Sequence, residues 1–187
     1  NNILSIIVNL PGIISTDDMV LNERNWRDVQ NYINECLEDL DNFRISEGTA
    51  LENALKNYVK KIENQLNEIS QFEKQRIEDT RMRLMNNFMQ FKENVQLNKE
   101  RFEQEIFYYI EKLDITEEKV RLKQHCDYFI QTLSECESGK KLAFIAQEMG
   151  REINTIGSKA NNIHIQKLVV QMKDELEKIK EQVNNVL

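Results

Sequence analysis

Two carboxylates in the C-terminal quarter of this 187-residue sequence are the first candidates for chemistry. Glu148 and Glu152 stand four residues apart, so a helix would carry both on one side. Such a pair could hold a divalent cation or take part in acid–base chemistry. The same residues also fit a solvated helix face of alternating charge, and the pattern alone leaves both interpretations open.

Side chains that could bind phosphate surround this carboxylate pair. Amides and hydroxyls stand among them beside the cations, and such directional hydrogen-bonding groups are poor choices for solubility alone. This feature favours a binding surface over a merely solvated face. The candidate phosphate-binding set is Lys140, Lys141, Gln147, Arg151, Asn154, Ser158 and Lys159.

A second constellation lies earlier in the chain and contains Asp114, Glu117, Glu118, Arg121 and His125. Steps of three and four place these groups along one side of a helix. An imidazole near carboxylates could transfer a proton, because its pKa lies near neutrality and an acid orients its tautomer. The alternative is a capped helix start with a Glu117–Arg121 ion pair and a half-buried histidine.

Absent motifs exclude several enzyme classes. The sequence has no GxxxxGK(S/T), GxGxxG, HExxH or GxSxG, which argues against nucleotide-driven, dinucleotide-linked and serine-hydrolase functions. We therefore expect no nucleotide or organic cofactor. Only two histidines are present, too few for a multi-histidine metal site, and three cysteines without CxxC spacing indicate reduced thiols in a cytoplasmic protein.

Charge is distributed unevenly along the chain. The net charge is −7, yet residues 139–173 contain six basic and two acidic side chains, a local balance of +4. Local charge decides where a phosphate backbone can bind. No apolar run approaches the roughly 18–20 residues of a membrane span, so we expect no membrane partner.

Glycine and proline are scarce, which predicts long helices. The chain has five Gly and one Pro, and none of them lies between Gly48 and Gly139. Apolar residues recur at helical spacing from Trp26 to Leu40 and again from Leu51 to Phe72. A polar set at 94–99 is the best candidate for a reversal. The fold class expected is all-α, with a long antiparallel, coiled-coil-like arm and a compact C-terminal helical module.

Three helices are expected in that module. The first, over 116–133, is expected to direct Val120, Leu122 and Phe129 toward a core, and Asp114 with Thr116 marks its start. Ser138–Gly139 separates it from the second helix, which is built on apolar positions from 142 to 156, and the third follows a start signal at Asn161–Asn162. A short apolar helix is expected at residues 2–9, before Pro11–Gly12.

The segment GKKLAFIAQEMGREINTIGSKANN, residues 139–162, strongly resembles the YicC-like family of bacterial proteins. Residues 10–13, 44–48, 114–125 and 175–185 are similar to further landmarks of that family. The resemblance implies a metal-dependent endoribonuclease that assembles as a ring-like homo-oligomer, a hexamer, around RNA. It also implies that 1–48 ends an N-terminal family domain with its connecting helix, 49–112 form the arm and 113–187 the signature domain.

The resemblance matches many of the candidate residues by position, and the motif together with the local positive charge suggests roles for them. Glu148, Glu152 and His125 are the expected catalytic residues, and the two glutamates are expected to bind Mg or Mn. The middle of the chain also departs little from the family pattern, whereas Ala143 and Gly150 stand where many relatives have Asp and Asn. A non-catalytic helical scaffold or a non-cleaving RNA-binding protein remains the alternative. The expected RNA-binding residues are Arg121, Lys140, Lys141, Gln147, Arg151, Asn154, Ser158 and Lys159.

Overall fold

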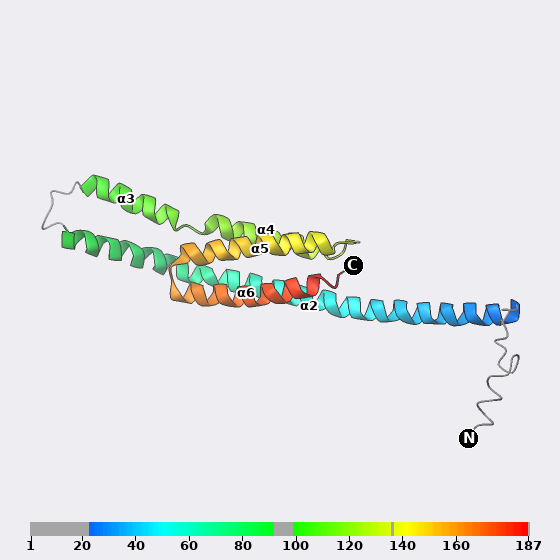
Figure 1. Ribbon diagram of the computed structural model, residues 1–187. Helices are drawn as coiled ribbons and strands as arrows, with labels where there is room; N and C mark the ends of the chain where they lie inside the picture. Colours follow the sequence, from blue (N-terminus) through cyan, green and yellow to red (C-terminus); the bar gives the residue numbers. More distant parts are fainter. Residues whose placement is uncertain (1–22, 92–98, 136, 187) are drawn as a thin grey trace, which may run out of the picture. The chain divides into compact units, whose positions relative to one another are not determined.

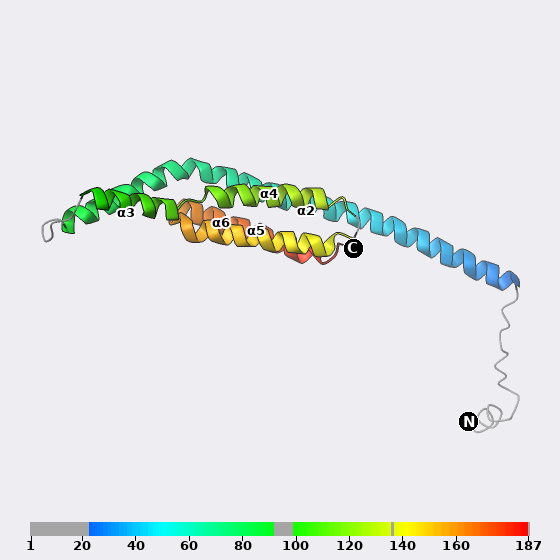
Figure 2. The ribbon, with the colours of Figure 1, turned by 90° about the horizontal axis from the view of Figure 1, so that it is seen from above.

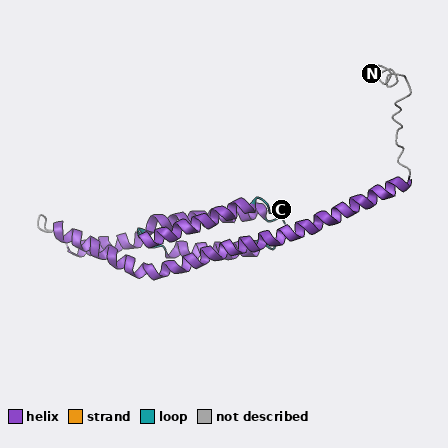
Figure 3. Cartoon of the chain, turned by 90° about the horizontal axis from the view of Figure 1, so that it is seen from below, coloured by secondary structure: helices purple, strands orange, loops and turns teal. Residues whose placement is uncertain are grey.

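A computed structural model describes residues 23–91, 99–135 and 137–186 of the chain. All regular structure within these ranges is α-helical, as Figures 1 and 3 show. The prediction of an all-α fold is confirmed. The expected short helix at 2–9, Pro11–Gly12 and the reversal at 94–98 lie outside the described residues. The helices are α2 (Glu23–Phe91), α3 (Lys99–Lys112), α4 (Thr116–Thr132), α5 (Gly139–Ala160) and α6 (Ile163–Val183).

Internal contacts divide the chain into two units, Asn1–Ser46 and Glu47–Leu187. The described part of the first unit is the beginning of α2, where the apolar stripe from Trp26 to Leu40 is exposed. In the second unit α2 continues through Gly48 without interruption. Within the described residues, no helix combines the length and the apolar character needed to cross a membrane.

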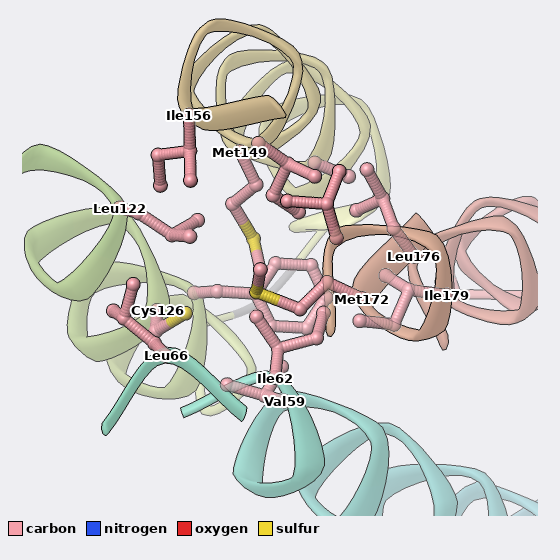
Figure 4. Packing of buried hydrophobic residues seen from close by; sticks show 14 of the residues in the cluster. Val59, Ile62, Leu66, Leu122, Cys126, Met149, Ile156, Met172, Leu176 and Ile179 are labelled. Atoms are coloured by element: carbon pink, nitrogen blue, oxygen red, sulfur yellow. The ribbon is translucent and has the colours of Figure 1, made fainter. Parts of the chain in front are cut away.

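The core of the second unit lies between α2 and the helices α4, α5 and α6. The α2 side chains Leu55, Val59, Ile62, Leu66 and Ile69 are buried there, at the spacing that the sequence predicted for one helix face. Figure 4 shows Ile62 and Leu66 directed toward side chains of α4, α5 and α6. A stripe of this kind buries one side of each helix and leaves its opposite side to carry polar groups.

Helix α3 runs antiparallel to the last part of α2, and Figures 1 and 2 both draw the two side by side. Ile106 of α3 is buried, which is consistent with packing on that side. The expected antiparallel arm is therefore present. Along the chain, α2 leads from the module into this arm, and α3 leads back to α4.

One expected core residue is wrongly placed by the sequence reasoning. Leu122 and Phe129 are buried, but Val120 is 53% exposed. Residues two apart in a helix are separated by about 200° around its axis, so Val120 and Leu122 cannot share a buried face. The apolar character of Val120 was misleading.

Polar side chains bind the backbone at two helix starts that the sequence predicted, although the N-cap residue of α4, Ile115, has no side-chain cap. Asp114 Oδ1 accepts hydrogen bonds from Thr116 N at 3.3 Å and Thr116 Oγ1 at 2.8 Å. Asn162 Oδ1 accepts from the backbone N–H groups of His164 and Ile165. These contacts fix the first turns of α4 and α6.

Arg76 of α2 ties three chain segments together. Its Nη1 donates to the carbonyl oxygens of Leu113 at 3.0 Å and of Lys159 and Ala160 at 3.3 Å. Burial lowers the pKa of Arg76, while the nearby carboxylates of Glu73 and Asp114 oppose that effect. One side chain thus satisfies carbonyls at the end of α5 and before α4.

Candidate functional site

An ion pair between α4 and α5 sets the register of the candidate site. Lys159 Nζ lies 2.7 Å from Oε1 of Glu118, and the two side chains are 33% and 8% exposed. The second carboxylate oxygen of Glu118 is buried without a hydrogen bond. Because Glu118 lies in the first turn of α4 and Lys159 in the last turn of α5, the two helices run antiparallel.

A second cluster joins α5 to the other end of α4. Lys141 Nζ lies 2.7 Å from Oε2 of Glu135 and 4.9 Å from the ring centroid of Tyr128. The hydrogen bond to Glu135, followed by Tyr128, raises the pKa of Lys141. The two helices therefore carry a cation–carboxylate contact at each end of their shared polar edge.

His125 and Glu152 lie between these two ends. His125 is seven residues after Glu118, and Glu152 is seven residues before Lys159. Seven residues are about two turns, so in an antiparallel pair His125 and Glu152 lie about level with each other, on the same side of their helices as Glu118 and Lys159. Both are half-buried. By this geometry, two of the three expected catalytic residues occupy matching positions on two neighbouring helices.

We call this edge the polar seam. It contains side chains from α4 and α5 that lie along the boundary of the buried core. Its members on α5 recur at steps of seven, four, three and four, which keeps them on one helix face. The polar seam consists of Glu118, Arg121, His125 and Tyr128 from α4, with Lys141, Glu148, Glu152, Thr155 and Lys159 from α5.

The acidic and imidazole groups at the centre of the polar seam are largely uncommitted. Within the described residues, neither His125 nor Glu152 has a hydrogen bond or an ion pair. Arg151 Nη1 lies 2.8 Å from Oε1 of Glu148, but that buried oxygen receives no hydrogen bond. Half-buried groups without partners are expensive to keep, which makes them candidates for a ligand.

The carboxylates of the polar seam suit a particular kind of metal site. Across the described ranges, no cluster of three or more His, Cys, Asp or Glu side chains could hold an ion. Mg²⁺ commonly binds proteins through only one or two carboxylates, with water and substrate phosphates completing its coordination. Glu148 and Glu152, with an orphaned oxygen on Glu148, fit that kind of site.

The remaining expected binding residues form an exposed stripe on α5 beside the polar seam. Ser158 Oγ donates to the carbonyl of Thr155 at 3.0 Å, so its proton is committed to the helix. Arg121 of α4 is paired with Glu117, the ion pair that the alternative interpretation of this segment predicted. The exposed α5 side chains of this stripe can meet a ligand that lies along the seam, although Arg151 also pairs with Glu148. They are Lys140, Gln147, Arg151, Asn154 and Ser158.

Comparison with known proteins now adds to this geometry. A family model described as "Endoribonuclease YicC-like, C-terminal" matches residues 69–187, which include α3 to α6 and the whole polar seam. The chain belongs to the YicC-like family. The sequence resemblance is therefore confirmed.

Two curated relatives extend the match beyond the family model. A "Probable endoribonuclease YicC" of Clostridioides difficile (strain 630) is 33% identical over 183 residues, 96% of this chain. A protein of the same name from Haemophilus influenzae is 27% identical over 186 residues, 98% of this chain. The chain spans 62% and 63% of the length of these relatives.

The two departures from the YicC-like pattern lie away from the polar seam. Ala143 is exposed on α5. A Cβ at Gly150 would lie 3.2 Å from Cδ2 of Leu176, so this position faces α6. Neither position belongs to the face on which His125, Glu148 and Glu152 lie.

Sequence reasoning missed the roles of Glu118 and Arg76. Glu118 was read as one of the acids at a helix start, but it is buried against Lys159. Its position among Ile115, Leu122 and Phe129 at helical spacing is the signal that it faces inward. Arg76 follows Phe72 by four residues on the same α2 stripe, which was a similar signal.

Proposed function

We propose that this YicC-like chain carries the RNA-cleaving site of an endoribonuclease. The observation that supports it best is that His125 and Glu152 are both half-buried on neighbouring antiparallel helices, without partners among the described residues, between the contacts of Lys141 and Lys159. General acid–base catalysis needs such groups within reach of one another and of the substrate. Both relatives are named as probable endoribonucleases, which agrees with this proposal.

Each seam residue has a role in this proposal. Glu148 and Glu152 would bind Mg or Mn, and the ion would supply Lewis-acid stabilisation of the charge on the phosphate. His125 transfers a proton to or from the reacting oxygen. The exposed guanidinium of Arg151 and the ammonium of Lys140 hold neighbouring phosphates.

Lys159 and Arg121, two of the expected phosphate-binding cations, contribute less to RNA binding in this proposal. Lys159 pairs with Glu118, and Arg121 with Glu117, whereas the carboxylate partner of Arg151 is Glu148, which would bind the ion instead. Because each cation is partly cancelled by its carboxylate, their contribution to RNA affinity is smaller than that of Lys140, which has no carboxylate partner among the described residues.

We further propose that the full-length protein works as a cytoplasmic homo-oligomeric ring, a hexamer, with RNA as its substrate. Supporting this, the first unit presents an exposed apolar stripe that includes Trp26, Ile33 and Leu40. Exposed apolar patches of this kind mark protein interaction surfaces. The division into an N-terminal part at 1–48, an arm at 49–112 and a signature domain at 113–187 belongs to the same proposal.

A cleavage assay with matched variants tests the proposed function. Full-length protein is incubated with end-labelled RNA, with Mg²⁺ or Mn²⁺ and separately with a chelator. Glu148→Gln combined with Glu152→Gln should abolish cleavage. The matched control is Glu177→Gln with Glu181→Gln, an exposed carboxylate pair of the same spacing on α6. Unchanged cleavage by the seam variant refutes the assignment.

The main rival is a protein that binds RNA or builds a scaffold without cutting. Its supporting observation is that no described cluster offers three metal ligands. Light scattering combined with an RNA titration separates the scaffold from the RNA-binding protein. An oligomer without RNA affinity at low salt is a scaffold. RNA affinity without cleavage in any divalent cation indicates a binding protein.

A further inference from the structure

A small polar pocket lies beside the turn between α5 and α6, outside the polar seam. Its volume is about 130 Å³, and its lining comes from one face of α2 and from the turn. Pockets for drug-sized ligands measure roughly 300–1,000 Å³, so this one suits a small group instead. The lining residues are Arg76, Asp79, Thr80, Arg83, Asn161 and Asn162.

The α2 face of this pocket offers hydrogen-bond donors that the fold does not use. Arg76 is 5% exposed, yet its Nε is buried without a hydrogen bond. Thr80 is 8% exposed, and no hydrogen bond to its hydroxyl occurs within the described residues. Arg83 is exposed and has no carboxylate partner in the same ranges. Unused donors around a small pocket point to an acceptor-rich ligand.

One carboxylate also lines the pocket and limits what can bind. Asp79 Oδ1 accepts a hydrogen bond from Gln75 Nε2 at 2.8 Å, which holds it on the α2 surface. Two guanidinium groups against one carboxylate leave a positive balance. Asp79 therefore weakens the binding of an anion without preventing it, and its removal should strengthen that binding.

The pocket adjoins the Lys159 end of the polar seam. Arg76, which lines the pocket, donates to the backbone carbonyls of Lys159 and Ala160. A chain of phosphates lying along the seam would therefore reach the pocket at the end of α5. We propose that this pocket binds a phosphate group of the RNA strand, with Arg83 as its main cation and Thr80 as a neutral donor. This proposal rests on the proposed function for the identity of the strand.

A binding experiment with the full-length protein tests the pocket. Fluorescence anisotropy follows a 5′-labelled single-stranded RNA in the presence of a chelator, over a series of salt concentrations. Arg83→Gln should weaken binding about fivefold or more, and should reduce the salt slope by about 0.7, the value for one phosphate contact on a single strand. Asp79→Asn should strengthen binding, whereas Thr80→Val should weaken it with an unchanged melting temperature.

Arg81→Gln is the matched control, because Arg81 is an exposed arginine of α2 that does not line the pocket. It removes the same charge and should change affinity less than twofold. Equal losses in Arg81→Gln and Arg83→Gln, or no loss in either, overturn the proposal. An Arg83→Gln protein that loses inorganic phosphate binding in a ³¹P titration but retains RNA affinity also overturns it, in favour of a free-phosphate site.

A parallel cleavage assay separates the pocket from the proposed function. Cleavage by the unmodified protein with unchanged RNA affinity in Arg83→Gln refutes the pocket alone. Absence of cleavage with an Arg83-specific loss of affinity refutes the nuclease function, and the pocket then stands as an RNA-binding site.

Discussion

Glu118 and Lys159 join the first turn of α4 to the last turn of α5 through a 2.7 Å contact between carboxylate and ammonium. Each charge also lies at the favourable end of its helix, an acid near the amino end and a base near the carboxyl end. The pair therefore contributes to stability and also aligns the seam that contains His125 and Glu152.

We expect a double-mutant cycle of Glu118→Gln and Lys159→Met to show a coupling energy of about 1–3 kcal/mol, because the carboxylate is buried. Urea unfolding followed by circular dichroism measures it. The exposed Glu117–Arg121 pair serves as the control, with an expected coupling of about 0.3–0.5 kcal/mol. A coupling no larger than that of the control would mean that the Glu118–Lys159 pair does not stabilise the helix pair.

We expect His125→Gln to lower kcat/KM for RNA cleavage by about 10²-fold, the usual contribution of a proton-transfer group. The chain has only two histidines, so His164→Gln is a natural control. His164 stacks on Phe72, with ring centroids 5.0 Å apart, and lies outside the seam. Similar rates for the two variants would exclude His125 from the chemistry.

Two glycine positions should respond to alanine in opposite directions. A Cβ at Gly48 meets no atom within 4 Å, so Gly48→Ala should raise the free energy of unfolding by about 0.5–1 kcal/mol. A Cβ at Gly139 would lie 2.5 Å from the backbone oxygen of Val186, so Gly139→Ala should lower it by about 1–3 kcal/mol. Urea denaturation of both variants gives the comparison, and the same sign for both would contradict the packing at Gly139.

Glu175 should make stability depend on acid pH. Burial alone would raise its pKa, but hydrogen bonds from Lys178 and Lys61 hold the pKa below its ordinary value of 4.5. The folded pKa is thus the lower one, so this contribution is present above about pH 4.5 and is lost as pH falls through the folded value. The stability difference between the unmodified protein and Glu175→Gln should therefore shrink from pH 7 to pH 3.

The exposed Glu177, which pairs with Lys180, provides the control for that titration. Glu177→Gln should show little pH-dependent difference, because an exposed pair contributes little. A difference between Glu175→Gln and the unmodified protein that is constant across this range would contradict the assigned pKa direction.

Periodicity within one helix was enough to predict part of this site. The spacing of Glu148 and Glu152 placed both on one face, and Asn162 was recognised as the start of a helix. The level at which α4 meets α5 was beyond such reasoning, because it depends on packing across the turn between them. The Glu118–Lys159 contact is a consequence of that packing.

Val120 shows the other limit of sequence reasoning. Its side chain is apolar, but only its angular position relative to Leu122 tells that it faces solvent. Arg76 shows the same limit for polar groups, since its three carbonyl partners lie 37, 83 and 84 residues further along the chain. Interactions of such range leave no local pattern.

The three carbonyls held by Arg76 also bear on the order of folding. Nη1 can reach all three only when the end of α5 and the link before α4 have both docked on α2, so we expect these bonds to form after the folding transition state. Contacts absent from the transition state govern the unfolding rate and leave the folding rate nearly unchanged. The hydrogen bonds of Arg76 would then slow the unfolding of the module that carries the polar seam, with little effect on its folding rate.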